Sequence, residues 1–197
     1  SVDHAEAVRH FTATAGTSFA TGPNSIITGG DILIDAGGEV ALGNSSAGGL
    51  IDVAGTQIDF GNLLAGLTVS LQTALDPLAS APGNGNIAGQ SITAGAGDSL
   101  IRARDGGDIV ITGLIAADAV QVLADAGAIT SGGLNPRLFA NLTAAGAISL
   151  TGNSLGTNTF FADGASTQLG NSSITNGNVT LVARTGGSVI TLGGCCG

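Results

Sequence analysis

Lysine, methionine, tryptophan and tyrosine are absent from the sequence, and only 10% of its 197 residues are charged. Five arginines stand against 14 acidic residues, and the formal charge of −9 opposes binding to nucleic-acid phosphates and to anionic membranes. The absence of tryptophan and tyrosine also removes the usual stacking platforms for bases and sugars. No apolar run approaches the length of a membrane span. We therefore expect neither a nucleic-acid partner nor membrane insertion.

Cysteine is almost as scarce, since the only two stand side by side as Cys195 and Cys196. A disulfide between neighbours in sequence needs a strained ring, and two adjacent cysteines cannot staple the fold. The pair is either dispensable or forms an intermolecular disulfide with a second subunit, which requires an oxidising compartment. Metal ligation is disfavoured because two thiols without further cysteine or a nearby histidine make a poor site.

The residues that are present favour strands and turns. Hydrophobic residues make up 43% of the sequence, and glycine occurs 34 times. That balance is too apolar for a disordered chain, and helix formers other than alanine are scarce. Short runs of alternating β-branched residues, such as Ile109 with Ile111 and Val120 with Val122, are separated by glycine and aspartate. We expect an all-β protein.

Two motifs recur at multiples of nearly twenty residues. R-D-G-G-D-I, from Arg104 to Ile109, returns eighty positions later as R-T-G-G-S-V, from Arg184 to Val189. A-G-A-I ends at Ile129 and again, nineteen positions later, at Ile148. An antiparallel sandwich has no reason to keep this spacing, whereas a parallel β-helix stacks equivalent residues of successive coils. The pattern predicts one right-handed parallel β-helix, a solenoid over residues 1–197, with about twenty residues per coil and about ten coils.

Three segments depart from the repeat. Asp3 and Glu6 have the spacing of a helix capping box, so we expect a short helical or irregular cap, or a docking arm, over residues 1–12. Residues 72–86 hold two of the four prolines and predict a loop inserted at one corner. Such a loop is a natural place for a specialised surface, and an excursion without any role is the alternative. Asn135-Pro136-Arg137 predicts a turn.

Several segments resemble the shaft repeats of filamentous-haemagglutinin-type exoproteins, which are large bacterial surface adhesins exported by two-partner secretion. They are G-D-I-V-I-T-G from Gly107, V-L-A-D-A-G-A-I-T from Val122, L-T-A-A-G-A-I-S-L-T from Leu142 and G-N-V-T-L-V-A-R-T-G-G-S-V-I-T-L from Gly177. The resemblance spans residues 27–194 and implies a right-handed β-helix, export across a Gram-negative envelope, and a role in adhesion, aggregation or matrix. The asparagine-proline-asparagine motif of the family's secretion domain is not reproduced by Asn135-Pro136-Arg137, so that role is not carried over.

Two clusters of polar residues are candidates for a site. His4, Glu6 and His10 suggest a metal site, but the two histidines would fall on different faces of a helix, and we expect no metal there. A second cluster lies within about one coil and comprises Asp105, Asp108, Asp118 and Asp125 with Arg102 and Arg104. In a β-helix polysaccharide lyase or hydrolase, such carboxylates would gather on an outer face. The alternative is that they are turn residues at successive corners, as Asp35 and Asp52 would be.

The sequence favours a structural or adhesive protein that is secreted or lies on a bacterial cell surface. We expect no catalytic, cofactor-binding or metal-binding residues, because neither histidine lies beyond the first ten residues and no nucleotide-binding motif follows a strand. The end of a solenoid presents unpaired strand groups, so we expect end-to-end self-association through the terminal coils. A host or neighbouring-cell surface is the other expected partner. The alternatives are a β-helix polysaccharide lyase or hydrolase, and a passive fragment of a longer shaft.

Overall fold

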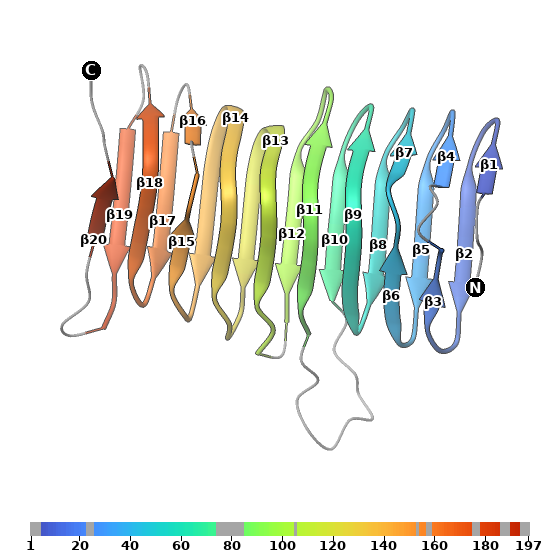
Figure 1. The fold of residues 1–197 in the computed structure, drawn as a ribbon, viewed down its shortest axis with the longest axis horizontal. Coiled ribbons are helices and arrows are strands. Elements are labelled where there is room, and N and C mark those ends of the chain that lie inside the picture. Colours follow the sequence, from blue (N-terminus) through green and yellow to red (C-terminus); the bar gives the residue numbers. More distant parts are fainter. Residues whose placement is uncertain are drawn as a thin grey trace.

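The computed structural model describes residues 5–22, 26–73, 85–104, 106–152, 154–156, 159–174, 178–185 and 190–193. Within these residues the chain forms twenty β-strands and no helix. Every strand pairing is parallel, and each strand pairs with strands of the preceding or following coil. The molecule is a parallel β-solenoid, seen in Figure 1 as a rod with β1 to β3 at one end and β19 and β20 at the other. The predicted all-β solenoid is confirmed.

The strands form three series of parallel ladders, which we call faces A, B and C. Face A holds β2 (Phe11–Ala15), β5 (Ile32–Ala36), β8 (Ile51–Gly55), β10 (Val69–Thr73), β12 (Ser99–Ala103), the ends of β13 (Ile109–Ala124) and β14 (Ile129–Ala144), β17 (Thr159–Gly164) and β19 (Asn178–Ala183). Face B holds β3 (Phe19–Ala20), β6 (Glu39–Leu42), the starts of β9 (Gln57–Ala65), β11 (Ile87–Ala94), β13 and β14, then β15 (Ile148–Leu150), the start of β18 (Thr167–Ile174) and β20 (Ile190–Gly193). Face C holds β1 (Ala5–Ala7), β4 (Ile26–Thr28), β7 (Ser45–Ala47), the ends of β9 and β11, the central parts of β13 and β14, β16 (Ser154–Gly156) and the end of β18.

The register gives the length of each coil. Ile32 pairs with Ile51, nineteen residues later, and Val120 pairs with Ala140, twenty residues later. Face A contains eight such steps, so the solenoid makes about eight turns and the expected ten was too many. One reason is a single long coil, because Val69 pairs with Ser99, thirty residues later.

The predicted insertion over 72–86 falls within this long coil. Gln72 and Thr73 belong to β10, so these two residues are not part of a loop, and Ile87 begins β11. Residues 74–84 lie outside the described part of the chain. Where the chain rejoins the corner, Gly85 has a φ of 48°, which favours glycine, and its missing Cβ leaves room for the carbonyl of Arg104.

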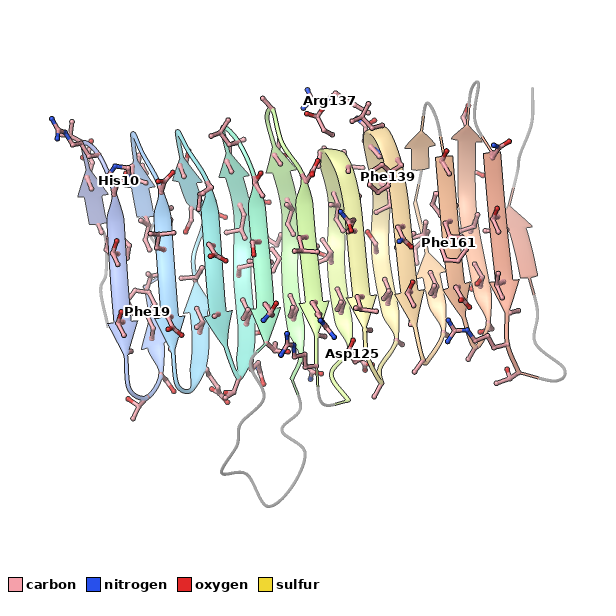
Figure 2. The ribbon with its side chains drawn as sticks, turned by 180° about the vertical axis from the view of Figure 1, so that it is seen from behind. His10, Phe19, Asp125, Arg137, Phe139 and Phe161 are labelled. Carbon is pink, nitrogen blue, oxygen red and sulfur yellow. The ribbon has the colours of Figure 1, made fainter. Side chains whose placement is uncertain are left out.

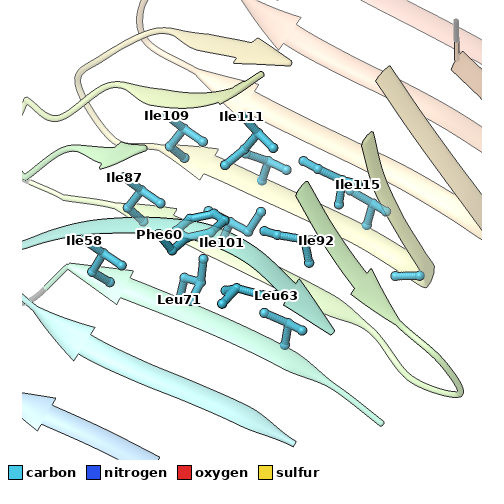
Figure 3. Close-up of a cluster of buried hydrophobic side chains, with 14 of the residues drawn as sticks. Ile58, Phe60, Leu63, Leu71, Ile87, Ile92, Ile101, Ile109, Ile111 and Ile115 are labelled. Atoms are coloured by element: carbon cyan, nitrogen blue, oxygen red, sulfur yellow. The ribbon is translucent and has the colours of Figure 1, made fainter. Parts of the chain in front are cut away.

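Alternating side chains build the core. Residues of β5 are alternately buried and exposed, and Ile32, Ile34 and Ala36 point inward. Stacked coils place these residues beneath Ile51 and Val53, and the columns continue along the rod. Figure 3 shows the centre of this core, where isoleucine, leucine and phenylalanine from all three faces meet. Fully burying one such side chain is worth about 1.5–3 kcal/mol, so the columns are the main source of stability.

The expected cap at the start of the chain is wrong for its described residues. Residues 5–7 form β1, which pairs in parallel with β4, and residues 11 and 12 begin β2. The alternation of Phe11, Ala13 and Ala15 with two threonines has a period of two, which suits a strand. Ladder bonds to the next coil outweigh a capping box, whose Asp3 lies outside the described residues. This segment is therefore the first coil of the solenoid.

The predicted turn at Asn135-Pro136-Arg137 is also wrong, because these residues lie inside β14. Pro136 is buried opposite Ala117 of β13, and the register shifts between Ala117 and Ala119. The shift leaves Asp118 out of the ladder, so the proline stands at an irregularity, where its missing N–H costs little.

Candidate functional site

The candidate acids at the corners bind the backbone of the next coil. Asp108 Oδ1 accepts a hydrogen bond of 2.7 Å from the N–H of Ala128, twenty residues later. The N–H of Asp108 in turn donates to Asn86 Oδ1 at 2.8 Å. Side chain and backbone thus form a relay that links three successive coils at one corner. A backbone N–H left unpaired at a corner would be costly, so the carboxylate has a structural task here.

Two acids outside the predicted cluster make the same contact. Asp31 Oδ1 accepts from the N–H of Leu50 at 2.9 Å, and Asp98 Oδ1 accepts from the N–H of Ala119 at 3.1 Å. The interpretation of corner aspartates as turn residues is thus partly right, but it is wrong for Asp35 and Asp52, which lie within β5 and β8. The partner of each corner aspartate, however, lies one coil further on and not within its own turn.

The remaining described acids of the cluster form ion pairs between coils. Arg102 Nη2 lies 3.0 Å from Asp125 Oδ2, with both side chains about one-third exposed. Arg137 pairs with Asp118 and also donates to the carbonyl of Gly95. Exposed pairs of this kind contribute only about 0–1 kcal/mol each to the free energy of unfolding. They link neighbouring coils but add little to the stability of the fold.

Arg184 and Asp163 form the same kind of ion pair closer to the end of the rod that holds β19 and β20. Its hydrogen bond to Asp163 raises the pKa of Arg184 above the ordinary value, and desolvation opposes this only in part. Because a raised pKa favours the charged form of a base, the guanidinium stays protonated throughout the neutral range. The arginine of this ion pair therefore carries its positive charge at every pH near neutral.

The cluster does not converge on one groove. Asp125 and Arg137, which holds Asp118, lie at opposite edges of the rod in Figure 2. Asp108 is engaged at its corner, and Asp105 lies outside the described residues. Arg104 donates its backbone N–H to Thr73 Oγ1 at 2.8 Å, at the corner where the insertion begins. The predicted groups thus occur in separate structural contacts.

Of the histidine cluster, the structure describes Glu6 and His10. His10 Nδ1 lies 3.1 Å from Asp31 Oδ2 and also accepts from the N–H of Asp31. Glu6 lies on β1, and His4 is outside the described residues. Among the residues that the structure describes, no group of three or more histidine, cysteine, aspartate or glutamate residues is placed to hold a metal ion. Cys195 and Cys196 also lie outside them, so the intermolecular disulfide stays a prediction.

An amide ladder, made by residues that the sequence analysis did not single out, follows the corner between faces B and C. Asn44 Oδ1 accepts from both the backbone N–H and the side-chain amide of Asn62, at 2.9 and 3.0 Å. Asn62 Nδ2 also donates to Gln90 Oε1 at 3.1 Å, and Ser91 Oγ donates to Asn62 Oδ1 at 2.6 Å. The recurring pairs Gly43-Asn44 and Gly61-Asn62 were the available signal. Identical amides one coil apart stack as ladders do in cross-β structures.

Beside this ladder lies an open hollow of about 440 Å³. Its lining crosses four coils and consists of Thr21, Gly22, Ala41, Leu42, Gly43, Asn44, Asp59, Phe60, Gly61 and Gln90. Asp59 is the only carboxylate among the described residues that line it, and Gln57 Nε2 donates to Asp59 Oδ2 at 2.7 Å. Glycoside hydrolysis in its usual form needs two carboxylates flanking the bond, and this hollow offers one.

Comparison with models of known protein families finds no match, and neither do comparisons with curated proteins and with solved structures. The resemblance to filamentous-haemagglutinin-type repeats therefore rests on the sequence motifs and on the parallel β-solenoid fold. The described part of the chain has no helix long and apolar enough to cross a membrane.

Proposed function

We propose that this protein is a structural or adhesive shaft, which works through its length and rigidity. The observation that carries the proposal is the use of its polar groups. Asp31, Asp98 and Asp108 bind the backbone of the next coil, and three arginines pair with acids across coils. These contacts engage nine of the 19 charged residues, and each contact joins one coil to the next.

The proposal places the protein outside the cell, secreted or on a bacterial surface, as the resemblance to exported adhesins suggests. Its expected partners are further copies of the chain and the surface of a host or neighbouring cell. An enzyme acting on polysaccharides is the competing function, and the observation in its favour is an open hollow of about 330 Å³ on face A whose lining includes two carboxylates, Asp35 and Asp52. The separate engagement of Asp108, Asp118 and Asp125 supports the shaft instead.

A bead assay combined with a turnover assay tests this proposal. Beads coated with the purified chain should attach to or aggregate bacterial or epithelial cells more than beads coated with heat-denatured chain. The same preparation, incubated with uronic-acid and neutral polysaccharides, should release no reducing ends or unsaturated uronides. Turnover that disappears in an Asp59→Asn variant, or in Asp35→Asn and Asp52→Asn variants, would replace the shaft by an enzyme, with the corresponding hollow as its site.

A further inference from the structure

The first coil leaves its inward side chains partly uncovered. β2 pairs with β5, and the other edge of β2 faces no strand among the described residues. The half-buried inward residues of this coil are Ala5, Phe11, Ala13, Ala15 and Phe19. Their ladder partners one coil further on, Ile26, Ile32, Ile34, Ala36 and Val40, are at most 3% exposed. One more coil at this end would bury the first set as completely as the second.

The last face A strand is uncovered in the same way. β19 pairs with β17, and no described strand lies along its other edge. Val179 is 49% exposed, whereas its ladder partner Phe160 is only 3% exposed. Leu181 is also half-buried at this end. Figure 1 shows β2 and β19 at opposite ends of the rod, so one molecule carries two complementary edges that cannot meet each other.

The inward side chains of β2 match those of β17, the strand that already packs on β19. β17 presents Phe160, Ala162 and Gly164 to Val179, Leu181 and Ala183. β2 carries phenylalanine, alanine and alanine at the same alternate positions, as Phe11, Ala13 and Ala15. A β2 strand laid on the free edge of β19 would therefore repeat a packing that the molecule makes internally. Phe11 would lie over Val179, as Phe160 does, and the alanines of β2 would lie over Leu181 and Ala183.

The hydrogen-bonding groups also suit this register. The N–H of Phe11 donates to Asp31 of the next coil, so the N–H groups of Thr12 and Thr14, which alternate with it, point to the free edge. The N–H of Arg184 donates to Gly164, so those of Val179, Leu181 and Ala183 point to the free edge of β19. No charged side chain of β2 or β19 would face another across this ladder.

We infer that the two ends form one joint, in which β2 of one copy adds in parallel to β19 of another, with Phe11 opposite Val179. This inference rests on the proposed role as a self-stacking shaft and names its contact. The joint is head to tail and therefore does not close, so it generates filaments of one molecule per repeat. Its occupant is a second copy of this chain, because β2 repeats the inward side-chain pattern with which β17 already packs on β19.

Thr12→Pro and Val179→Glu each block one half of the joint. Proline removes an N–H that points away from β5, and edge prolines prevent strand addition. Glutamate at position 179 would bury a carboxylate against Phe11. Either change should raise by at least about tenfold the concentration at which filaments of the 197-residue chain form, as measured by sedimentation velocity and electron microscopy. The matched control is Leu100→Glu, since Leu100 is 43% exposed in the middle of face A, and its filaments should be unchanged.

Mixing the two blocked variants gives the decisive measurement. At a concentration above the wild-type threshold for filaments but below that of either variant, each variant alone should stay monomeric. An equimolar mixture should form a dimer and nothing longer, because one variant keeps an intact β19 edge and the other an intact β2 edge. Unchanged circular dichroism and unfolding midpoints would show that both variants fold. Filaments that survive Val179→Glu, or unmodified chains that stay monomeric at every concentration, would overturn the joint. Neither result would touch the adhesion and turnover tests of the shaft.

Discussion

Gly66 lies directly against the carbonyl of Gly48, one coil away, so that a Cβ on Gly66 would stand 2.1 Å from that oxygen. The same corner aligns Gly29 beneath Gly48, where a Cβ would stand 2.3 Å from the carbonyl oxygen of Gly29. Real Cβ atoms do not approach backbone oxygens so closely, and a backbone atom cannot swing aside as a side chain can. The spacing of the coils therefore depends on glycine at this corner.

Gly66→Ala should destabilise the protein by about 1–3 kcal/mol, because the coils must separate locally to admit a methyl group. Gly16→Ala is the control, since no atom of the described residues other than Gly16 and its chain neighbours lies within 4 Å of a Cβ at that position. That change should be neutral or stabilising by about 0.4–1 kcal/mol through the unfolded state. Urea unfolding of both variants, followed by circular dichroism, measures the difference. Equal effects would mean that the corner tolerates a side chain.

Ser99 and Ser131 are both fully buried but differ in their partners. Ser99 Oγ has no hydrogen-bond partner in the described structure, whereas Ser131 Oγ donates to the carbonyl of Gly133 at 3.1 Å and accepts from its N–H at 3.3 Å. Ser99→Ala should therefore leave stability unchanged or raise it by about 1 kcal/mol, and Ser131→Ala should lower it by about 1–3 kcal/mol. Opposite shifts of the urea midpoint are expected. A large loss from Ser99→Ala would reveal a partner for its hydroxyl.

Asp108 distinguishes a structural carboxylate from a catalytic one. Asp108→Ala removes the acceptor for the N–H of Ala128 and should cost about 0.5–2 kcal/mol, as the loss of a helix cap does. Asp108→Asn keeps an oxygen at that position and should retain most of the stability. Amide hydrogen exchange at Ala128 reports the contact directly and should accelerate in the alanine variant alone. A turnover of any polysaccharide that both variants abolish equally would contradict the structural role.

The ion pair between Arg184 and Asp163 predicts a flat response to alkaline pH. The pKa of Arg184 is raised in the folded state, so its contribution is fully present below the unfolded pKa and is lost only above the folded one. Both lie far above neutral pH, because arginine titrates only in strong base. The difference in unfolding midpoint between the wild type and Arg184→Gln should therefore stay constant from neutral to moderately alkaline pH. A difference that shrinks in this range would place another titrating group in the pair.

The repeated motifs were sufficient to predict the solenoid. Arg104 and Arg184 begin motifs eighty positions apart, and the structure places them at one corner, four coils from each other. The strand at the start of the chain was missed because three residues around Glu6 resemble a capped helix, and only the ladder to β4 decides between the two. The local sequence around Glu6 does not reveal the pairing partner of this strand, because that partner lies twenty-one residues further along the chain.

The candidate site could be predicted only as far as its residue types. Aspartate at corners is visible in the sequence, but the partner of Asp108 depends on the register between two coils. The contact between Asn62 and Gln90 is harder still to predict, because it spans the long coil and its insertion. A single altered coil length shifts every later pairing, so contacts beyond the insertion cannot be extrapolated from a fixed period.

That insertion also has a consequence for how such a rod can change. Val69 still meets Ser99, and Ile58 still meets Ile87, although this coil is about ten residues longer than its neighbours. The hydrophobic columns pass this level without interruption. The place therefore behaves as a graft point, at which foreign peptides of differing length could be spliced in and displayed while the scaffold underneath keeps its alignment.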